Sequence, residues 1–500
     1  MSATYGVVAV ALVSVATLAI GAYGLRFSRT TSDFYVASRS VSPFLNGSAI
    51  GGEYLSAASF LGVAGLVLVA GVDMLWYPVG WTAGYLLLLV LVAAPLRRSG
   101  AYTIPDFTEV RLQSRTVRRV ASAMVVVVGW LYLMPQFQGA GLTLRSVTGA
   151  PTWVGSVVVA VVVVANVVSG GMRSITFVQA FQYWLKLTAL LVPLVLCVAA
   201  WFGDGAPGPT AAGASGSWVR PLEGGGPGLY AVYSIILATF LGTMGLPHVV
   251  VRFYTNPDGG AARRTTLLVL GLLGAFYLLP GVYGVLGRVY ASDLVADGRS
   301  DIVVLELPGR VVGGGLGDLL AALLVAGAFA AFLSTSSGLT MSVAGVVAQD
   351  VLGRRLGGVA AFRVAAALSV VVPLALALGT DSIPVASSVG FAFAVAASTF
   401  CPLLVLGIWW RRLTAPGAVA GLVGGGAAAG GAVAATIATG TGDAWWQVLL
   451  AQPAAWSVPL GFGLMIGVSL LTQHRTPSNV ARTMVRLHTP ERLRVERADP

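Results

Sequence analysis

Apolar runs of about 20 residues recur almost from one end of this chain of 500 residues to the other. A run of that length, wound as an α-helix, crosses the roughly 30 Å hydrocarbon layer of a membrane. Charged residues make up only 10% of the chain, whereas a soluble domain carries about 25%. A chain so poor in charge cannot cover itself with groups that water solvates. We therefore predict an all-α polytopic membrane protein.

We expect about thirteen membrane spans from the lengths of these runs. The ninth run is too long for one crossing, so we expect one of its ends to lie outside the bilayer. No basic region precedes the first run, and Arg26 and Arg29 follow it, so we expect a retained helix and no signal peptide. The runs lie near 5–25, 44–70, 74–94, 120–144, 151–170, 174–201, 229–250, 265–287, 313–348, 359–379, 385–409, 416–437 and 455–472.

The basic residues are distributed unequally between alternate loops. Apart from Lys186 they are all arginines, and one set of loops holds 24 of them whereas the opposite set holds 5. Loops rich in arginine and lysine stay on the cytoplasmic side of a membrane. We therefore expect a multi-pass protein of the cell (inner) membrane with its N-terminus outside, and a basic tail, 473–500, in the cytoplasm. We attribute the net charge of +11 to the arginines of these cytoplasmic loops and expect no nucleic-acid partner.

Two of the spans contain glycine-rich polar interruptions. The second span contains Gly51 and Gly52 next to a glutamate, and the seventh contains Gly242, Gly245 and Pro247. In transporters, a matched pair of broken helices marks the binding site near the middle of the membrane. These two spans lie five apart, as two inverted repeats of five helices would require. Close helix packing is the alternative role for the glycines.

Charged and hydroxyl side chains lie inside the apolar runs. Glu53 is in the second span and Lys186 in the sixth, and an ionisable residue at that depth is costly enough to indicate a function. Glu53 either shapes a cation or substrate path or serves as structural glue. Lys186 either reaches towards the interface, pairs with Glu53 or offers its charge to a carboxylate. The ninth span has four consecutive hydroxyl residues at 334–337, whose oxygens suit a weakly held monovalent cation.

Several segments of the chain, taken together and in their order along the sequence, are similar to those of one transporter family. The chain resembles the solute:sodium symporter family, and within it the branch of acetate and monocarboxylate permeases, from about residue 33 to residue 421. The segment that ends at Leu246, Pro247 and His248 is the most similar to the acetate branch. The segments are GGEYLSAASFLG at 51–62, YTIPDF at 102–107, GGMR at 170–173, GTMGLPH at 242–248, RFY at 252–254, STSS at 334–337 and GAVAG at 417–421.

The resemblance implies the LeuT-like fold of two inverted five-helix repeats, with one extra helix before them and two after. It divides the chain into an extra N-terminal helix and cytoplasmic loop (1–43), a first repeat (44–201), an extracytoplasmic loop (202–228), a second repeat (229–409), two C-terminal helices (410–472) and the tail (473–500).

The resemblance also implies a site for sodium as the coupling ion, with no other cofactor. In the family, backbone carbonyls at the first break and in the hydroxyl-rich helix hold the ion together with two hydroxyls. Matched by motif, the carbonyls are those of Gly51, Tyr54 and Ala331, and the hydroxyls are those of Ser334 and Thr335.

Three positions depart from the family pattern and keep proton coupling open as an alternative. Many relatives have aspartate where this chain has Glu53. Relatives with a further acid on the sixth span have it where this chain has Gln179, which weakens the case for a second sodium site. Lys186 could place an ammonium near the position of a bound cation.

For the solute we expect contacts from polar side chains that face the centre. The candidates are Ser56 at the first break, Gln136 and Gln138 on the fourth span, and Thr243 at the second break, with ordinary helix packing as the alternative for each. The predicted function is sodium-coupled symport of acetate or another short-chain monocarboxylate by alternating access. The same fold with another solute, such as proline, a sugar or an ureide, is the alternative.

A different class of function has little support in the sequence. A transporter-derived sensor would normally carry an appended signalling domain, and none follows His474. The glycine-rich stretches at 224–228 and 422–431 lack the strand–turn–helix context of a nucleotide site. No metal, nucleophile–base or phosphate-loop pattern is evident, so we predict no enzyme. The expected partners are a small solute and the lipid bilayer, without an obligate protein partner.

Overall fold

The computed structural model describes residues 3–24, 40–211, 213–222, 225–353, 356, 358–379, 384–442, 444–491 and 493. Helices form the whole of the regular secondary structure in these residues, as predicted. Some arginines used for the topology lie outside the described residues, namely Arg26, Arg29, Arg39, Arg354, Arg355, Arg492, Arg494 and Arg497.

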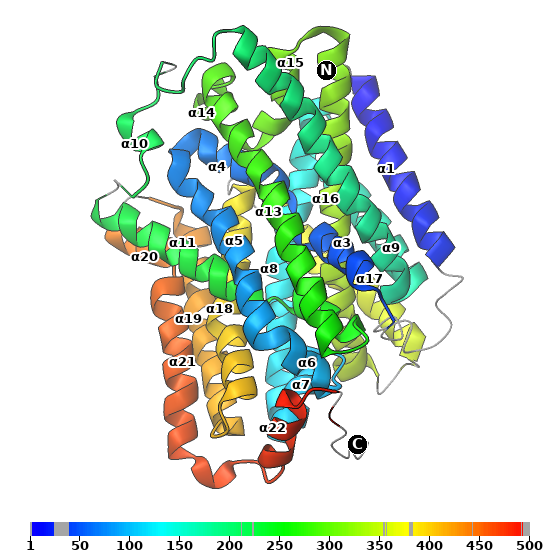
Figure 1. Ribbon diagram of the computed structural model, residues 1–500, viewed down its shortest axis with the longest axis vertical. Helices are drawn as coiled ribbons and strands as arrows, with labels where there is room; N and C mark the ends of the chain where they lie inside the picture. The colour runs from blue at the N-terminus through cyan, green and yellow to red at the C-terminus, as the bar shows by residue number, and fades with distance from the viewer. Residues whose placement is uncertain are drawn as a thin grey trace.

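The first half of the chain contains a peripheral helix, α1, followed by helices that cross the molecule (Figure 1). The helix α3 is continued after a gap by η3 and α4, and α5 is continued by η5 and α6. The elements are α1 (Ala3–Gly24), α3 (Pro43–Tyr54), η3 (Ala58–Gly62), α4 (Val63–Ala70), η4 (Gly71–Leu75), α5 (Trp76–Leu87), η5 (Leu88–Val92), α6 (Ala93–Ser99), α7 (Ile104–Leu112), α8 (Arg115–Thr148) and α9 (Thr152–Gly203).

The second half begins after a short helix and a loop and again contains an interrupted helix, α11 followed by α12. The elements are α10 (Gly216–Val219), α11 (Gly226–Gly245), α12 (Pro247–Val251), η6 (Arg252–Thr255), α13 (Gly259–Tyr290), α14 (Asp293–Ala296), η7 (Ser300–Ile302), α15 (Val303–Val311), α16 (Gly314–Val347), η8 (Ala348–Leu352), α17 (Gly358–Gly379), α18 (Val385–Trp409), α19 (Ala415–Thr439), α20 (Trp445–Ala451), α21 (Ala454–Leu471), η9 (Gln473–Arg475) and α22 (Val480–His488).

In the described residues, 11 helical segments are long and apolar enough to cross a membrane. Two of them, of 42 and 52 residues, each cover two of the thirteen predicted spans. At 1.5 Å per residue, the longer one would extend about 78 Å as a single helix, more than twice the hydrocarbon layer. Its backbone leaves the helical region at Gly171, with φ 59° and ψ −170°. The count of thirteen crossings remains a prediction. The first described helix, α1, begins near one end of the long axis, and α22 lies at the other (Figure 1).

The interior of the bundle is built from α3, α8, α9, α11, α16 and α18, which contact one another extensively. Almost every residue of α18 is buried, whereas only about a third of the residues are buried in α1, at the edge of the molecule in Figure 1, and in α21. An exposed apolar helix suits contact with lipid, and a helix that is apolar on all sides and buried suits the centre of a bundle. The interrupted helices therefore lie among the most protected elements.

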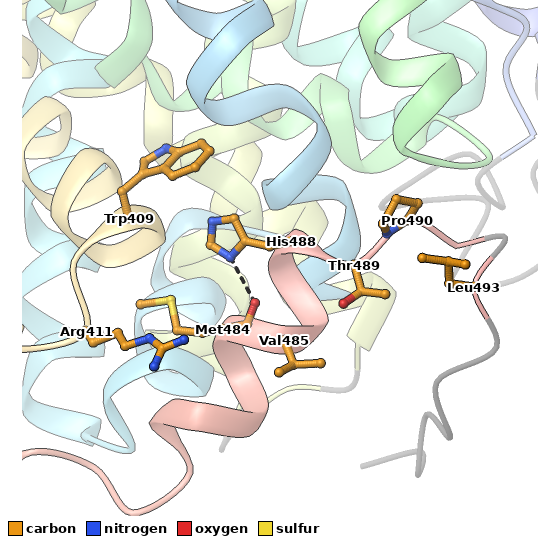
Figure 2. A pocket seen from close by; sticks show the side chains of 8 residues that line it. All are labelled: Trp409, Arg411, Met484, Val485, His488, Thr489, Pro490 and Leu493. Carbon is orange, nitrogen blue, oxygen red and sulfur yellow. Dashed lines mark hydrogen bonds between the residues drawn. The ribbon is translucent and has the colours of Figure 1, made fainter.

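The end of the molecule formed by α6, α7 and α22 lies at the bottom of Figure 1, and we call it the basic face. There α22 packs on α6 and on the end of α18. The ring of His488 stands edge-on to Trp409 with centroids 4.7 Å apart, and its Nδ1 lies 2.9 Å from the carbonyl oxygen of Met484 (Figure 2). The opposite face carries α10, α14 and α15 (Figure 1).

Candidate functional site

The first helix interruption falls between α3 and η3. The helix α3 ends at Tyr54, Leu55 is extended with φ −74° and ψ 90°, and the chain becomes helical again at Ala58. The break is thus a few residues after the predicted position, because α3 continues through Gly51 and Gly52.

Gly52 is needed for close packing of α3 on α9. A Cβ atom at this position would collide with the carbonyl oxygen of Gln179 on α9. The glycine pair therefore corresponds to the alternative role that the sequence left open, helix packing in a membrane.

The second interruption falls where the sequence predicts it. The helix α11 ends at Gly245, Leu246 is extended with φ −74° and ψ 117°, and α12 begins at Pro247. Proline suits a first helical position because its missing N–H would have no partner there. The two interrupted helices are connected by a hydrogen bond of 2.7 Å between the hydroxyls of Tyr54 and Thr243.

Backbone carbonyls of α3 and hydroxyls of α16 meet beside the first interruption. Ser334 Oγ lies 2.7 Å from the Gly52 carbonyl oxygen and 3.1 Å from that of Ala331. Thr335 Oγ1 donates to the Glu53 carbonyl oxygen at 2.6 Å. We call these three carbonyls and two hydroxyls the oxygen cluster.

The oxygen cluster unites three of the residues predicted to bind sodium, Ala331, Ser334 and Thr335, with the end of α3. The other two, Gly51 and Tyr54, directly flank the α3 carbonyls of the cluster. The Gly51 carbonyl also accepts the N–H of Leu55 at 3.1 Å.

Lys186 reaches the oxygen cluster from α9. Its ammonium donates to the carbonyl oxygens of Gly52 and Leu55, the latter at 2.7 Å, and to Ser334 Oγ at 2.9 Å. The side chain is completely buried. Lys186 thus bonds to freed backbone carbonyls, which were not among the partners considered from the sequence, and makes no ion pair with Glu53.

Glu53 instead pairs with Arg252, at the end of the second interrupted helix. Glu53 Oε2 and Arg252 Nε are 2.6 Å apart, and both side chains are at most 2% exposed. Arg252 also donates to Thr176 Oγ1 at 2.9 Å and to Gln179 Oε1, while Gln179 Nε2 donates to the Ser334 carbonyl at 2.8 Å. Gln179 therefore connects the ion pair with α16.

Sequence reasoning missed Arg252 as part of the site, because it was counted with the arginines of the loops. It lies five positions after Pro247. At 1.5 Å per residue, that places it only about 7.5 Å from the second break. This distance was the available signal that its charge lies inside the bundle.

The residues predicted to contact solute are all buried but occupy different positions. Gln136 Oε1 accepts the N–H of Ala57 at 2.9 Å, so its amide already binds the backbone at the first break. Gln138 lies roughly 200° further around the same helix and cannot face the same space. Thr243 Oγ1 donates to Thr239 O at 2.7 Å, and Ser56 forms the break itself.

Aromatic rings fill the space beside the two interruptions. The ring of Tyr54 stands edge-on to Tyr85, with centroids 4.9 Å apart, and Trp81 and Tyr132 each lie 5.7 Å from Phe393. The rings come from α3, α5, α8 and α18. Edge-on rings at such distances are a stabilising arrangement, and they leave a dense apolar wall around the polar break.

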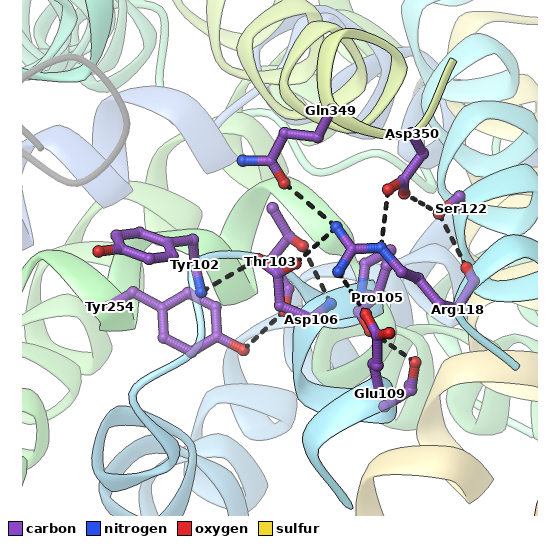
Figure 3. A network of polar contacts seen from close by, with 11 residues as sticks. Tyr102, Thr103, Pro105, Asp106, Glu109, Arg118, Ser122, Tyr254, Gln349 and Asp350 are labelled. Carbon is purple, nitrogen blue, oxygen red and sulfur yellow. Dashed lines mark hydrogen bonds and ion pairs between the residues drawn. The ribbon is translucent and has the colours of Figure 1, made fainter. Parts of the chain in front are cut away.

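On the basic face, Arg118 forms a polar network that joins α7, α8 and η8 (Figure 3). Its guanidinium lies 2.8 Å from Asp106, 2.6 Å from Glu109 and 2.7 Å from Asp350. Burial raises the pKa of the Asp106 carboxyl above its ordinary value, although Arg118 acts in the opposite direction. The nearby Tyr254 donates to the Thr103 carbonyl at 3.4 Å.

At the opposite face, a polar pocket lies between the end of α8, the loop after α14 and the start of α18. Arg145, Arg299 and Asp301 are among its lining residues. Asp301 Oδ2 accepts the N–H of Val385, the first residue of α18, at 3.2 Å. The ion pairs on the basic face and the pocket here lie at opposite ends of the interrupted helices.

Several solved structures have a similar fold. A substrate-bound, outward-open Na+-coupled sialic acid symporter superposes with a TM-score of 0.68 at 15% identity, over 92% of this chain and 98% of that one. Mhp1, a nucleobase-cation-symport-1 family transporter, gives 0.54 at 16% identity over 92% and 99%, and MhsT in complex with L-phenylalanine gives 0.53 at 15% over 86% and 98%. The fold is therefore that of the LeuT-like membrane transporters.

Sequence comparison defines the family. The model of the sodium:solute symporter family matches residues 34–425. A symporter of Bacillus subtilis (strain 168) described as uncharacterized, YwcA, is 31% identical over 509 residues, which cover 95% of this chain and 96% of that protein. The chain belongs to the sodium:solute symporter family.

Proposed function

We propose that this protein couples the inward movement of sodium to the uptake of a small solute, with acetate or another short-chain monocarboxylate as the substrate. The oxygen cluster is the observation that carries the sodium assignment. It presents carbonyl and hydroxyl oxygens, without a carboxylate, from the end of α3 and from α16 beside the helix break. Neutral oxygens suit a monovalent cation because they bind it without an excess of negative charge. The Na+-coupled sialic acid symporter, which shares the fold, supports the same assignment.

The balance of charges beside the breaks supports an anionic substrate. Glu53 and Arg252 neutralise each other in their ion pair. The hydrogen-bond partners of the Lys186 ammonium are two carbonyl oxygens and one hydroxyl, all of them neutral. One positive charge is therefore left over near the first break, and a substrate carboxylate would reduce its cost in the membrane interior. The closely packed aromatic rings favour a small solute over a sugar.

Alternating access would move the solute between the two faces. We propose that residues 44–201 and 229–409 form the two inverted repeats and that the basic face is cytoplasmic. The pair of interrupted helices supports this, and so do α8 and α16, which occupy equivalent places in the two halves and have the same length of 34 residues. In such transporters, one bundle rocks against the rest around a central site.

The proposal is tested by uptake of labelled acetate into proteoliposomes at fixed pH, with and without an inward sodium gradient. We expect sodium to stimulate uptake, and unlabelled short-chain monocarboxylates to compete better than proline, a sugar or an ureide. Sodium-stimulated uptake of another solute would contradict the monocarboxylate assignment and support sodium as the coupling ion. Uptake driven only by a pH gradient would show that protons, and not sodium, are the coupling ion.

A further inference from the structure

The chain contains one lysine, Lys186, and the structure buries it completely at the helix break. It lies on α9, in the part that follows the irregular backbone at Gly171. From there its side chain crosses to α3 and α16. A charged side chain at this depth usually pairs with another charge or with backbone carbonyls. Lys186 takes the second course, because its hydrogen-bond partners are two carbonyls and one hydroxyl.

The hydrogen bonds define the chemical form of the Lys186 side chain. The carbonyl oxygens of Gly52 and Leu55 can only accept hydrogen bonds. The hydroxyl of Ser334 has one hydrogen, and the Gly52 carbonyl oxygen 2.7 Å away is its closest acceptor, so we infer that towards Lys186 it also accepts. Three acceptors around Nζ require three N–H donors, and only the ammonium has three. The Lys186 side chain is therefore a cation held in a cage of oxygens.

This cage shares its atoms with the proposed sodium site. The Gly52 carbonyl and Ser334 Oγ belong to the oxygen cluster, and both bond to Nζ. A sodium ion on these oxygens would lie within a few ångströms of the ammonium. Two positive charges at that separation in a protein interior repel each other strongly. The two cations therefore cannot occupy the cluster together.

We propose that Lys186 is a tethered competitor of sodium, whose ammonium must leave the oxygen cluster before a sodium ion can bind there. This inference rests on the proposed sodium-coupled function and adds a residue that determines how much sodium the transporter needs. Lys186 holds the end of α3 against α16 in the sodium-free state. Sodium takes over that role when it displaces the side chain.

The Glu53 carboxylate would attract the displaced ammonium. Glu53 is the charged group that acts on Lys186 electrostatically. Its Oε2 pairs with Arg252, and its Oε1 lies beside Gly338 of α16. The hydroxyls of α16 offer no charge. Glu53 Oε1 is thus the acceptor towards which a displaced Lys186 would turn.

The test compares the wild type with Lys186→Met and Lys186→Gln at one fixed pH, by binding of radioactive sodium to the purified proteins and by the sodium dependence of acetate uptake. We expect the sodium concentration for half-saturation to fall at least tenfold in both variants. Gln182→Met is the matched control, because Gln182 lies one turn earlier on α9 and donates to Thr17 of α1 at 3.0 Å, outside the cluster. Ser334→Ala added to Lys186→Met should abolish the gain.

Equal or weaker sodium binding in monodisperse Lys186→Met and Lys186→Gln would overturn the inference, and Lys186 would then be a structural strut. Tight sodium binding by the variants, together with acetate uptake that ignores sodium in all proteins, would instead refute the proposed function. A measurement on the wild type needs no variant. Lys186 is the one lysine of the chain, so the rate at which a small amine-reactive reagent modifies it can be followed by mass spectrometry. We expect sodium, but not choline at equal ionic strength, to raise this rate, and an unchanged rate contradicts displacement.

Discussion

Arg252 at the end of the second interrupted helix donates from Nε to the Glu53 carboxylate of the first at 2.6 Å, and both side chains are almost completely buried. The pair connects α3 with the end of α12. Because neither charge has water around it, each depends on the other for compensation. The two interrupted helices are therefore coupled by a charge pair as well as by the Tyr54–Thr243 hydrogen bond.

Removing one member of this pair should destabilise the protein strongly. For Arg252→Gln or Glu53→Gln we expect a loss of about 3–5 kcal/mol, the usual cost of leaving one partner of a buried ion pair uncompensated. The melting temperature in detergent should fall, and uptake should be lost. The double variant should recover part of the melting temperature because it leaves no unpaired charge. If each single variant melts like the wild type, the pair does not hold the two helices together.

The hydroxyls of the oxygen cluster should control the dependence on sodium. For Ser334→Ala combined with Thr335→Ala, we expect the sodium concentration for half-maximal uptake to rise at least about tenfold, equivalent to roughly 1.4 kcal/mol. Ser336→Ala is the control, since Ser336 is equally buried on α16 but makes no hydrogen bond to α3 among the described residues. An unchanged sodium dependence in the double variant would show that sodium binds elsewhere.

The helices could be predicted from sequence because a membrane helix is a local property. The length and hydropathy of a run are set by neighbouring residues, and the local chemistry of Pro247 located the second break correctly. The first break was placed too early because glycine serves both broken and closely packed helices. At Gly52 the neighbouring carbonyl of Gln179, which sequence does not reveal, decides between them.

The contacts of the charges could not be predicted, because they depend on which helices pack together. Glu53 and Arg252 are 199 positions apart. The partners of Lys186 remained open for the same reason, since they depend on how α9 lies against α3 and α16. Ser334 and Thr335 could be assigned to the first break from the sequence, because their motif resembles that of a family whose members pack their helices in the same way.

The network around Arg118 should keep the basic face closed. Three carboxylates from α7 and η8 lie within 2.8 Å of one guanidinium, and a network of this kind contributes more than an isolated surface pair. For Arg118→Ala we expect a lower melting temperature and slower uptake, because the ends of α8 and η8 separate. Arg119→Ala removes a charge from the next, exposed residue and should change neither quantity. Equal behaviour of the two variants would exclude a closing role for the network.

Asp301 should make the stability of the opposite face depend on pH. Burial raises the pKa of its carboxyl from an ordinary value of 3.8 to about 6. An acid with a raised pKa in the folded state binds more protons folded than unfolded, so its contribution is fully present below pH 3.8 and is lost as the pH rises through about 6. Asp301→Asn stays neutral and keeps an acceptor for the Val385 N–H. We therefore expect the variant to melt like the wild type near pH 4 and a few degrees higher at pH 7. Since all other groups are the same in both proteins, the difference between their melting curves isolates this carboxyl, and a difference that does not vary with pH would mean that Asp301 titrates alike in the folded and unfolded chains.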